Sequence, residues 1–278
     1  MDAFARCFRL VFAQLYGGGI LALSIPPFHQ LERGFYKSSA AVYLGTGLLV
    51  FAGRVTLVLR PSAASSAPGV ASLAELCLWG ASLLAGAIYL RSLWGEAYRL
   101  RARAYACTWM SAVAALAVGA QSFRLDPAFS IQTILYPVCF IVSALVLGSV
   151  TTGMLLGHWY LIDRNLSLEP FHRIFRFFVA MLLLQATLLL LDGGLLRWGG
   201  AAATRAAVTQ LLHDHSALLA VRLLLSPVGT AGLAWMIWRT LRIPQTMAAT
   251  GLFYIAILSV LVGELMGRFI LFRTSLPL

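Results

Sequence analysis

The chain has 278 residues, of which 60% are hydrophobic and only 11% charged, and its mean hydropathy is +0.84. A soluble domain of this size cannot hide so much apolar surface, so the composition excludes a soluble protein and predicts a polytopic membrane protein. The formal net charge of +11 would indicate nucleic acid as a partner of a soluble protein. Here the arginines lie mostly between apolar runs, where positive charge orients helices and contacts membrane lipid, so no nucleic acid is expected.

A membrane-spanning helix needs about 20 mostly apolar residues, and on that template the chain predicts about eight spans. The fold class is therefore all-α, a polytopic bundle that forms one transmembrane domain over residues 1–278. The connections 60–71 and 196–215 are longer than the others and are predicted as loops. In chain order the expected spans are 7–28, 37–59, 72–94, 103–121, 131–160, 174–195, 216–239 and 246–272.

The first span begins like a signal peptide, with two arginines before an apolar stretch. Pro26-Pro27 follow without a small-x-small cleavage pattern, so we expect a span that is retained. Within it, Gln14 and Tyr16 precede the cluster Gly17-Gly18-Gly19. Glycines let another backbone approach closely, which indicates helix packing or, as the alternative, the face by which a flat ligand enters.

The last span contains Gly263-Glu264-Leu265-Met266-Gly267-Arg268, which places two ionisable residues at membrane depth. Such residues cost roughly 2.5–3.5 kcal/mol on insertion scales, so they usually face the protein interior. Glu264 and Arg268 are four residues apart, share one helix face and can pair. The pair predicts either structural contact between helices or a polar site for a redox or proton-linked ligand.

Eight spans place both chain ends on the same side of the membrane. Lys and Arg are densest in the connection 91–103 on the other side, which the positive-inside rule assigns to the cytoplasm. We therefore expect a bacterial inner-membrane protein with both termini in the periplasm. In that topology seven ionisable residues fall in the half of the membrane nearest the termini and predict an acid–base cluster: Arg54, Arg60, Glu75, Asp192, Arg222, Glu264 and Arg268.

Cysteines and histidines argue against a metal centre. Cys7, Cys77, Cys107 and Cys139 lie far apart without a C-x-x-C pair, so they predict buried apolar thiols rather than a zinc site or iron–sulfur cluster. Only His158 among the five histidines lies in a predicted span, so a haem with two axial histidines is not expected. His158 itself is expected to reach lipid headgroups or to relay protons.

Four short strings of the sequence carry a family resemblance. They are Phe12-Ala13-Gln14 with Gly17-Gly18, Gly153-Met154-Leu155-Leu156-Gly157, the segment 217–225, and the 263–268 string already described, which is the most specific. Together with eight spans and outward termini they resemble the membrane-anchor subunit of the dimethyl sulfoxide reductase family, which is related to the polysulfide and nitrite reductase anchor proteins.

The resemblance implies a subunit without haem or iron–sulfur cluster that anchors an iron–sulfur subunit and a molybdopterin catalytic subunit. It also implies electron exchange with a membrane quinone, menaquinone or ubiquinone, and a role in quinol chemistry for Glu75. The chain departs from the family at the histidine after the second span, where it reads Val58-Leu59-Arg60-Pro61-Ser62. A carboxylate or tyrosine would then exchange the quinol's protons, or the chain would be an anchor only.

Quinol oxidation releases two electrons and two protons, so a site needs a group that accepts protons and donors that orient the ring. We predict Glu75 or Glu264 as the proton acceptor, with electrons leaving to the iron–sulfur partner. The expected quinone-binding residues are Gln14, Tyr16, Arg54, Arg60, Arg222 and Arg268.

Two other functions fit intramembrane charges. One is a transporter of a small solute or ion, although the paired broken helices typical of that class are not visible in the sequence. The other is an accessory subunit of a membrane complex with packing roles only.

Overall fold

The computed structural model describes residues 3–59, 69–126, 129–163, 166–243 and 245–277. This part of the chain is helical and contains no strand, which confirms the predicted all-α class. The elements are α1 (Ala3–Ala22), α2 (Arg33–Leu59), α3 (Val70–Ser92), α4 (Tyr98–Gln121), α5 (Gln132–Ile162), α6 (Glu169–Gly199), α7 (Ala202–Asp214), α8 (Ser216–Leu223), the π-helix η1 (Leu224–Gly229), α9 (Thr230–Arg242) and α10 (Thr246–Thr274).

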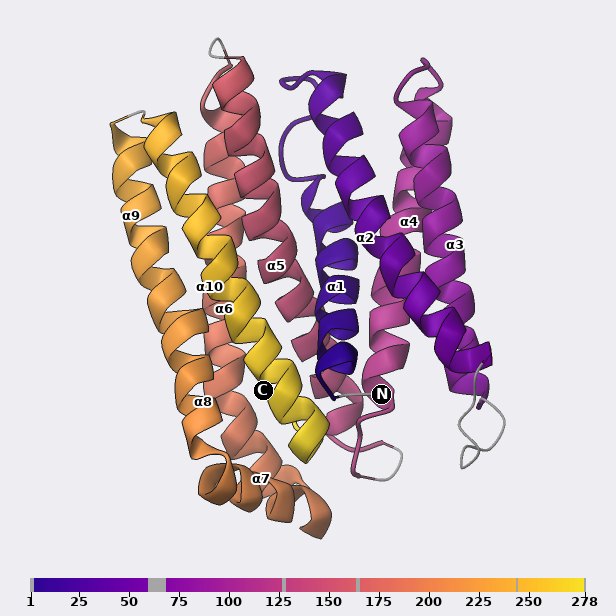
Figure 1. Cartoon of the computed structure of the whole chain (residues 1–278), viewed down its shortest axis with the longest axis vertical. Coiled ribbons are helices and arrows are strands. Elements are labelled where there is room, and N and C mark those ends of the chain that lie inside the picture. The colour runs from indigo at the N-terminus through magenta and orange to yellow at the C-terminus, as the bar shows by residue number, and fades with distance from the viewer. Residues whose placement is uncertain (1–2, 60–68, 127–128, 164–165, 244, 278) are drawn as a thin grey trace.

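The chain is a multi-pass membrane protein by the length and composition of its helices. Among the described residues, seven helical segments are long and apolar enough to span a membrane: α2 to α6, the continuous α8–η1–α9 and α10. The predicted first span corresponds to α1, whose 20 residues include two arginines and whose composition falls short of that standard. It nevertheless lies in the middle of the bundle among the longer helices (Figure 1).

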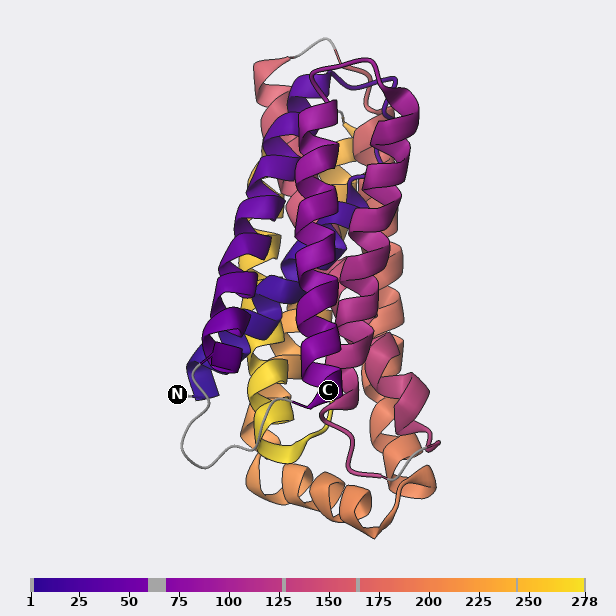
Figure 2. The same ribbon diagram turned by 90° about the vertical axis from the view of Figure 1, so that its right-hand side faces the viewer.

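The long helices form two sets of four that lie side by side. In the first set α1, α2, α3 and α4 contact one another in a ring, and in the second α5, α6, α9 and α10 do the same. Contacts of α1 and α4 with α5, and of α1 with α10, join the sets (Figures 1 and 2). Both chain ends lie at one end of the bundle, here called the terminal end, and the connections near residues 23–32 and 93–97 lie at the opposite end.

Glycines allow α1 and α5 to touch through their backbones. A Cβ atom on Gly18 would lie 1.7 Å from the carbonyl oxygen of Ala144, and one on Gly148 would lie 2.1 Å from the carbonyl carbon of Gly18. Neither position has room for a side chain, so the glycine cluster of the first span serves helix packing. The amide of Gln14 donates a hydrogen bond of 3.0 Å to the carbonyl of Phe140 across the same interface.

The connection 196–215 was predicted as a loop, and that prediction is wrong. Helix α6 continues to Gly199, and the short helix α7 follows at the terminal end, across the ends of α6 and α8 (Figure 1). Thr204, Ala207, Val208 and Leu211 form its buried face. Their i, i+3, i+4, i+7 spacing is the signal of an amphipathic helix, which the search for 20-residue apolar runs passed over.

Candidate functional site

The predicted acid–base cluster separates into two sites in the structure, one in each helix set. The first is the Glu75 cavity, which Arg54, Glu75 and their neighbours line. The second, here called the Glu264 cluster, consists of Ser143, Gln185, Arg222, Glu264 and Arg268. Phe140 lies between them, because it lines the cavity while the guanidinium carbon of Arg268 lies 4.9 Å from its ring centroid.

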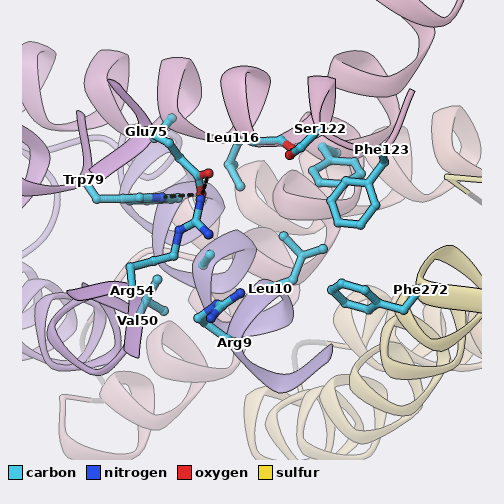
Figure 3. A pocket seen from close by; sticks show the side chains of 14 residues that line it. Arg9, Leu10, Val50, Arg54, Glu75, Trp79, Leu116, Ser122, Phe123 and Phe272 are labelled. Atoms are coloured by element: carbon cyan, nitrogen blue, oxygen red, sulfur yellow. Dashed lines mark hydrogen bonds and ion pairs between the residues drawn. The ribbon is translucent and has the colours of Figure 1, made fainter. Parts of the chain in front are cut away.

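The Glu75 cavity lies towards the terminal end of the first helix set and has a volume of about 90 Å³. Helices α1 to α4 supply most of its wall, and α5 and α10 each add one phenylalanine. The lining residues are Arg9, Leu10, Ala13, Val50, Arg54, Glu75, Trp79, Ala115, Leu116, Gly119, Ser122, Phe123, Phe140 and Phe272 (Figure 3).

The charged edge of this cavity is an ion pair between Arg54 of α2 and Glu75 of α3. The indole nitrogen of Trp79, one helical turn after Glu75, donates to Oε1 of the carboxylate at 3.4 Å. Both charged side chains keep some exposure, 19% for Arg54 and 14% for Glu75. Arg9 of α1 adds a second guanidinium to the lining, so two positive groups and one negative group face the same space (Figure 3).

Aromatic side chains form the apolar wall. The ring centroids of Phe123 and Phe140 are 5.9 Å apart, and those of Phe123 and Phe272 are 5.3 Å apart. Figure 3 shows Phe123 and Phe272 across the cavity from Trp79 and the ion pair. A polar edge and an apolar wall together suit a ligand that is flat and carries a few hydrogen-bonding atoms.

Gln14 and Tyr16 lie behind the cavity rather than in its wall. Gln14 bonds to the backbone of Phe140, and the ring of Tyr16 lies 5.9 Å from that of Trp79. The hydroxyl of Tyr16 is bonded to Ser82 at 2.8 Å. The two residues therefore hold lining residues in position. The geometry does not favour the direct contact with a ligand that was predicted for them.

Of the lining residues, only Arg54 and Glu75 were predicted from the sequence as site residues, and Arg9, Trp79 and Phe123 are among those that were not. Trp79 had a readable signal, since it stands four residues after Glu75 on the same helix face. Arg9 was interpreted only as a charge before the apolar stretch of the first span. Gly119 also matters, because a Cβ atom there would lie 3.2 Å from Glu75 Oε1, so its absence leaves space for the carboxylate.

The Glu264 cluster is closed and fully buried. Arg222 Nη1 and Arg268 Nη2 bind the two carboxylate oxygens of Glu264 at 2.9 and 3.0 Å, which confirms the predicted pairing of Glu264 with Arg268. The amide of Gln185 donates to Glu264 Oε1 at 2.6 Å. These three charged side chains are at most 1% exposed.

The cluster ties four helices together. Gln185 comes from α6, Arg222 from α8 and Glu264 and Arg268 from α10, while Ser143 of α5 accepts hydrogen bonds from Gln185 and Arg268 at 3.1 and 2.8 Å. The adjoining cavity, between Arg222 and Asp192, measures only about 10 Å³. A charged cluster with so little space beside it cannot hold a ligand, which favours the structural alternative for the Glu264–Arg268 pair.

A break in the seventh predicted span lies beside the cluster. The π-helix η1 begins two residues after Arg222 and contains Pro227. A Cβ atom on Gly263 would lie 2.5 Å from the Cβ atom of Ser226, so α10 packs directly on the break. The hydroxyls of Thr230 and Ser259 donate to the carbonyl of Leu225 at 3.1 and 2.7 Å, which supplies hydrogen bonds to the widened turn.

Other predicted residues have mixed outcomes. Arg60 lies outside the described residues. Cys7 and Cys139 are buried as predicted, but Cys77 and Cys107 are exposed on α3 and α4, so that part of the prediction is wrong. A thiol is apolar enough to face lipid, and an apolar run alone does not say which face is inside. His158 is exposed on α5.

The two sites differ in what they offer to a ligand. The Glu75 cavity combines an ion pair, a further arginine and aromatic walls with open space, whereas the Glu264 cluster pairs its charges inside the protein and has almost no space beside it. Among the described residues no group of three or more His, Cys, Asp or Glu side chains is placed to hold a metal ion. No protein-family model matches the sequence, and no curated protein matches it.

Proposed function

We propose that the chain is the quinone-interacting membrane subunit of an oxidoreductase complex, and that the quinone ring meets it at the Glu75 cavity. The observation that carries the proposal is the Arg54–Glu75 ion pair, which lines a cavity with aromatic walls inside a membrane bundle. The resemblance to the dimethyl sulfoxide reductase anchor supports it, since it implies quinol chemistry at Glu75.

The residues of the cavity match the demands of quinol oxidation. The ring loses two electrons and two protons, and Glu75 is the acceptor that takes the protons in turn and passes them to water at the terminal end. Arg54 and Arg9 donate hydrogen bonds to the quinone oxygens, and Trp79 offers an aromatic face to the ring. No histidine is needed in this scheme, because the Glu75 carboxylate accepts the protons that an imidazole accepts in the family.

The size of the cavity limits how much of the quinone it can enclose. Ligand pockets commonly measure about 300–1,000 Å³, so a cavity of about 90 Å³ holds the polar edge of the ring while the isoprenoid tail stays in the bilayer. In this direction the electrons leave to an iron–sulfur subunit, which passes them to a catalytic subunit. The cavity lies towards the terminal end, so we place the iron–sulfur partner there, on the periplasmic side of a bacterial inner membrane.

Copurification in a gentle detergent tests the proposal, with mass spectrometry of the partners and extraction of bound quinone. Iron–sulfur and catalytic partners together with menaquinone or ubiquinone are the expected result. Partners without quinone would contradict the quinone site and leave a purely structural anchor. A chain that purifies alone would contradict the subunit assignment as a whole.

One observation favours a transporter as the second candidate. The helix break at η1 lies beside three buried charges, and discontinuous helices with charges at membrane depth are typical of ion sites in transporters. The corresponding third helix of the first set, α3, is continuous over Val70–Ser92, so the break has no counterpart there. Solute flux into proteoliposomes that contain the chain alone would be the result expected of this alternative.

A further inference from the structure

A second cavity lies at the opposite end of the bundle, between the ends of α1 to α4. It measures about 350 Å³, within the usual range of ligand pockets. Its wall includes the aromatic side chains of Phe28, Tyr36, Tyr89 and Tyr105, together with Arg101. We call it the Arg101 pocket, and the proposed quinone site does not involve it.

Arg101 is a buried cation with unused hydrogen-bonding capacity. It is only 6% exposed, and its Nη2 donates to the carbonyl oxygens of Ser92 and Gly95 at 3.1 and 2.7 Å. Its Nε and Nη1 are buried without a hydrogen-bond partner among the described residues. No described carboxylate forms an ion pair with it, although a buried charge is normally paired.

Aromatic rings hold this guanidinium in place. Its central carbon lies 5.3 Å from the ring centroid of Phe28 and 5.2 Å from that of Tyr98. The guanidinium therefore lies against two aromatic rings, while two of its nitrogens have no acceptor among the described residues. An anionic oxygen is the partner that a desolvated guanidinium binds best.

Two tyrosine hydroxyls of the pocket are already engaged. The hydroxyl of Tyr36 donates to the carbonyl of Pro26 at 2.9 Å, and that of Tyr105 to the carbonyl of Ile20 at 2.6 Å. The described lining contains no carboxylate that could take up a proton. The pocket thus suits an anion with an apolar body, and it lacks the carboxylate on which the proposed quinol chemistry depends.

The residues around the pocket indicate the source of such an anion. Arg33 donates to the same Gly95 carbonyl at 3.1 Å, and Lys37 lies 4.5 Å from the ring of the exposed Trp94. Basic residues beside a tryptophan at a helix end are typical of the lipid headgroup level. A free phosphate would need neither the volume nor the aromatic wall.

We propose that the Arg101 pocket binds one anionic phospholipid, whose phosphate lies against the Arg101 guanidinium and supplies the counter-charge that no described carboxylate provides. The glycerol and upper acyl chains lie against the aromatic wall. The nearby Arg33 and Lys37 select an anionic headgroup over a zwitterionic one.

Native mass spectrometry of the delipidated full chain tests this site, with phosphatidylglycerol or phosphatidylcholine added back. One phosphatidylglycerol should bind in preference to phosphatidylcholine, and Arg101→Gln should weaken its binding about tenfold, as expected for the loss of the positive charge that pairs with the phosphate. Arg99→Gln is the matched control, because Arg99 is exposed at the same helix end and does not line the pocket. It should bind the lipid as the unchanged chain does.

A second variant keeps the test decisive if Arg101→Gln fails to fold. Ala102→Trp fills the pocket from an exposed lining position and leaves the bonds of Arg101 to Ser92 and Gly95 in place. It should also weaken phosphatidylglycerol binding. Undiminished phosphatidylglycerol binding by the folded Arg101→Gln or Ala102→Trp chain would overturn the proposal.

Three further results would also overturn it. Equal retention of phosphatidylcholine would show that the anionic charge is not recognised. Displacement of the lipid by inorganic phosphate would assign the site to a free anion. Displacement by a short-chain quinone would assign it to a quinone.

Discussion

Two glutamates pair with arginine inside this bundle, and their surroundings give them different roles. Glu264 is fully buried and accepts hydrogen bonds from Gln185 and two arginines, so no acceptor capacity faces a cavity. Glu75 keeps 14% exposure and lines open space. The same residue type is thus structural in one helix set and available to a ligand in the other.

Removing the charge of Glu264 should unfold the second helix set more readily. Glu264→Gln leaves two buried arginines without their counter-ion, which should lower the free energy of unfolding by about 3–5 kcal/mol. Denaturant or thermal unfolding in detergent measures the change. Glu169→Gln is the control, since its pair with Arg173 is exposed and contributes little; equal stability of the two variants would refute the structural role.

At the scale of helices, the contact of α1 with α5 sets how the two sets of four meet. The backbones touch at Gly18 and Gly148, whereas Gly153 and Gly157 of α5 make room for the side chains of Phe253 and Thr250 of α10. The sequence shows these glycines, but their partners come from distant parts of the chain. Spacing alone therefore predicted close packing without saying which helices pack.

A methyl group at this contact should separate the helix sets. Gly18→Ala places its Cβ atom against the Ala144 carbonyl, a backbone group that cannot rotate away, and overpacking of this kind costs about 1–3 kcal/mol. Gly45→Ala on α2 is the matched control, because nothing lies within 4 Å of its Cβ position. It should be neutral or stabilising, since alanine favours a helix interior; the same loss of unfolding free energy in both would contradict the packing account.

For the whole molecule, composition predicted the fold class but not the grouping of charges. Arg54, Glu75, Arg222 and Glu264 were predicted as one cluster, because all fall in the same half of the membrane. The structure divides them, since α2 and α3 belong to one helix set, whereas α10 and α8, which continues through η1 into α9, belong to the other. Depth in the membrane can be read from hydropathy, whereas helix neighbours depend on tertiary packing.

The shared terminal end leads to a prediction of orientation. The connections at the opposite end are rich in Lys and Arg, so alkaline phosphatase fused after residue 278 should be active in the periplasm. A truncated fusion after residue 97, at the basic end, should be inactive. The reverse pattern in intact cells would invert the topology and move the proposed iron–sulfur partner to the cytoplasm.

The central claim is that a quinone meets this chain at the Glu75 cavity, and photo-crosslinking with an azidoquinone tests it most directly. The labelled peptides should come from the cavity wall, around Arg9, Arg54, Trp79 and Phe123, and Glu75→Gln should reduce the labelling. Glu169→Gln should leave it unchanged. Labelling that falls in the Arg101 pocket instead, or that is indifferent to Glu75, would contradict the account.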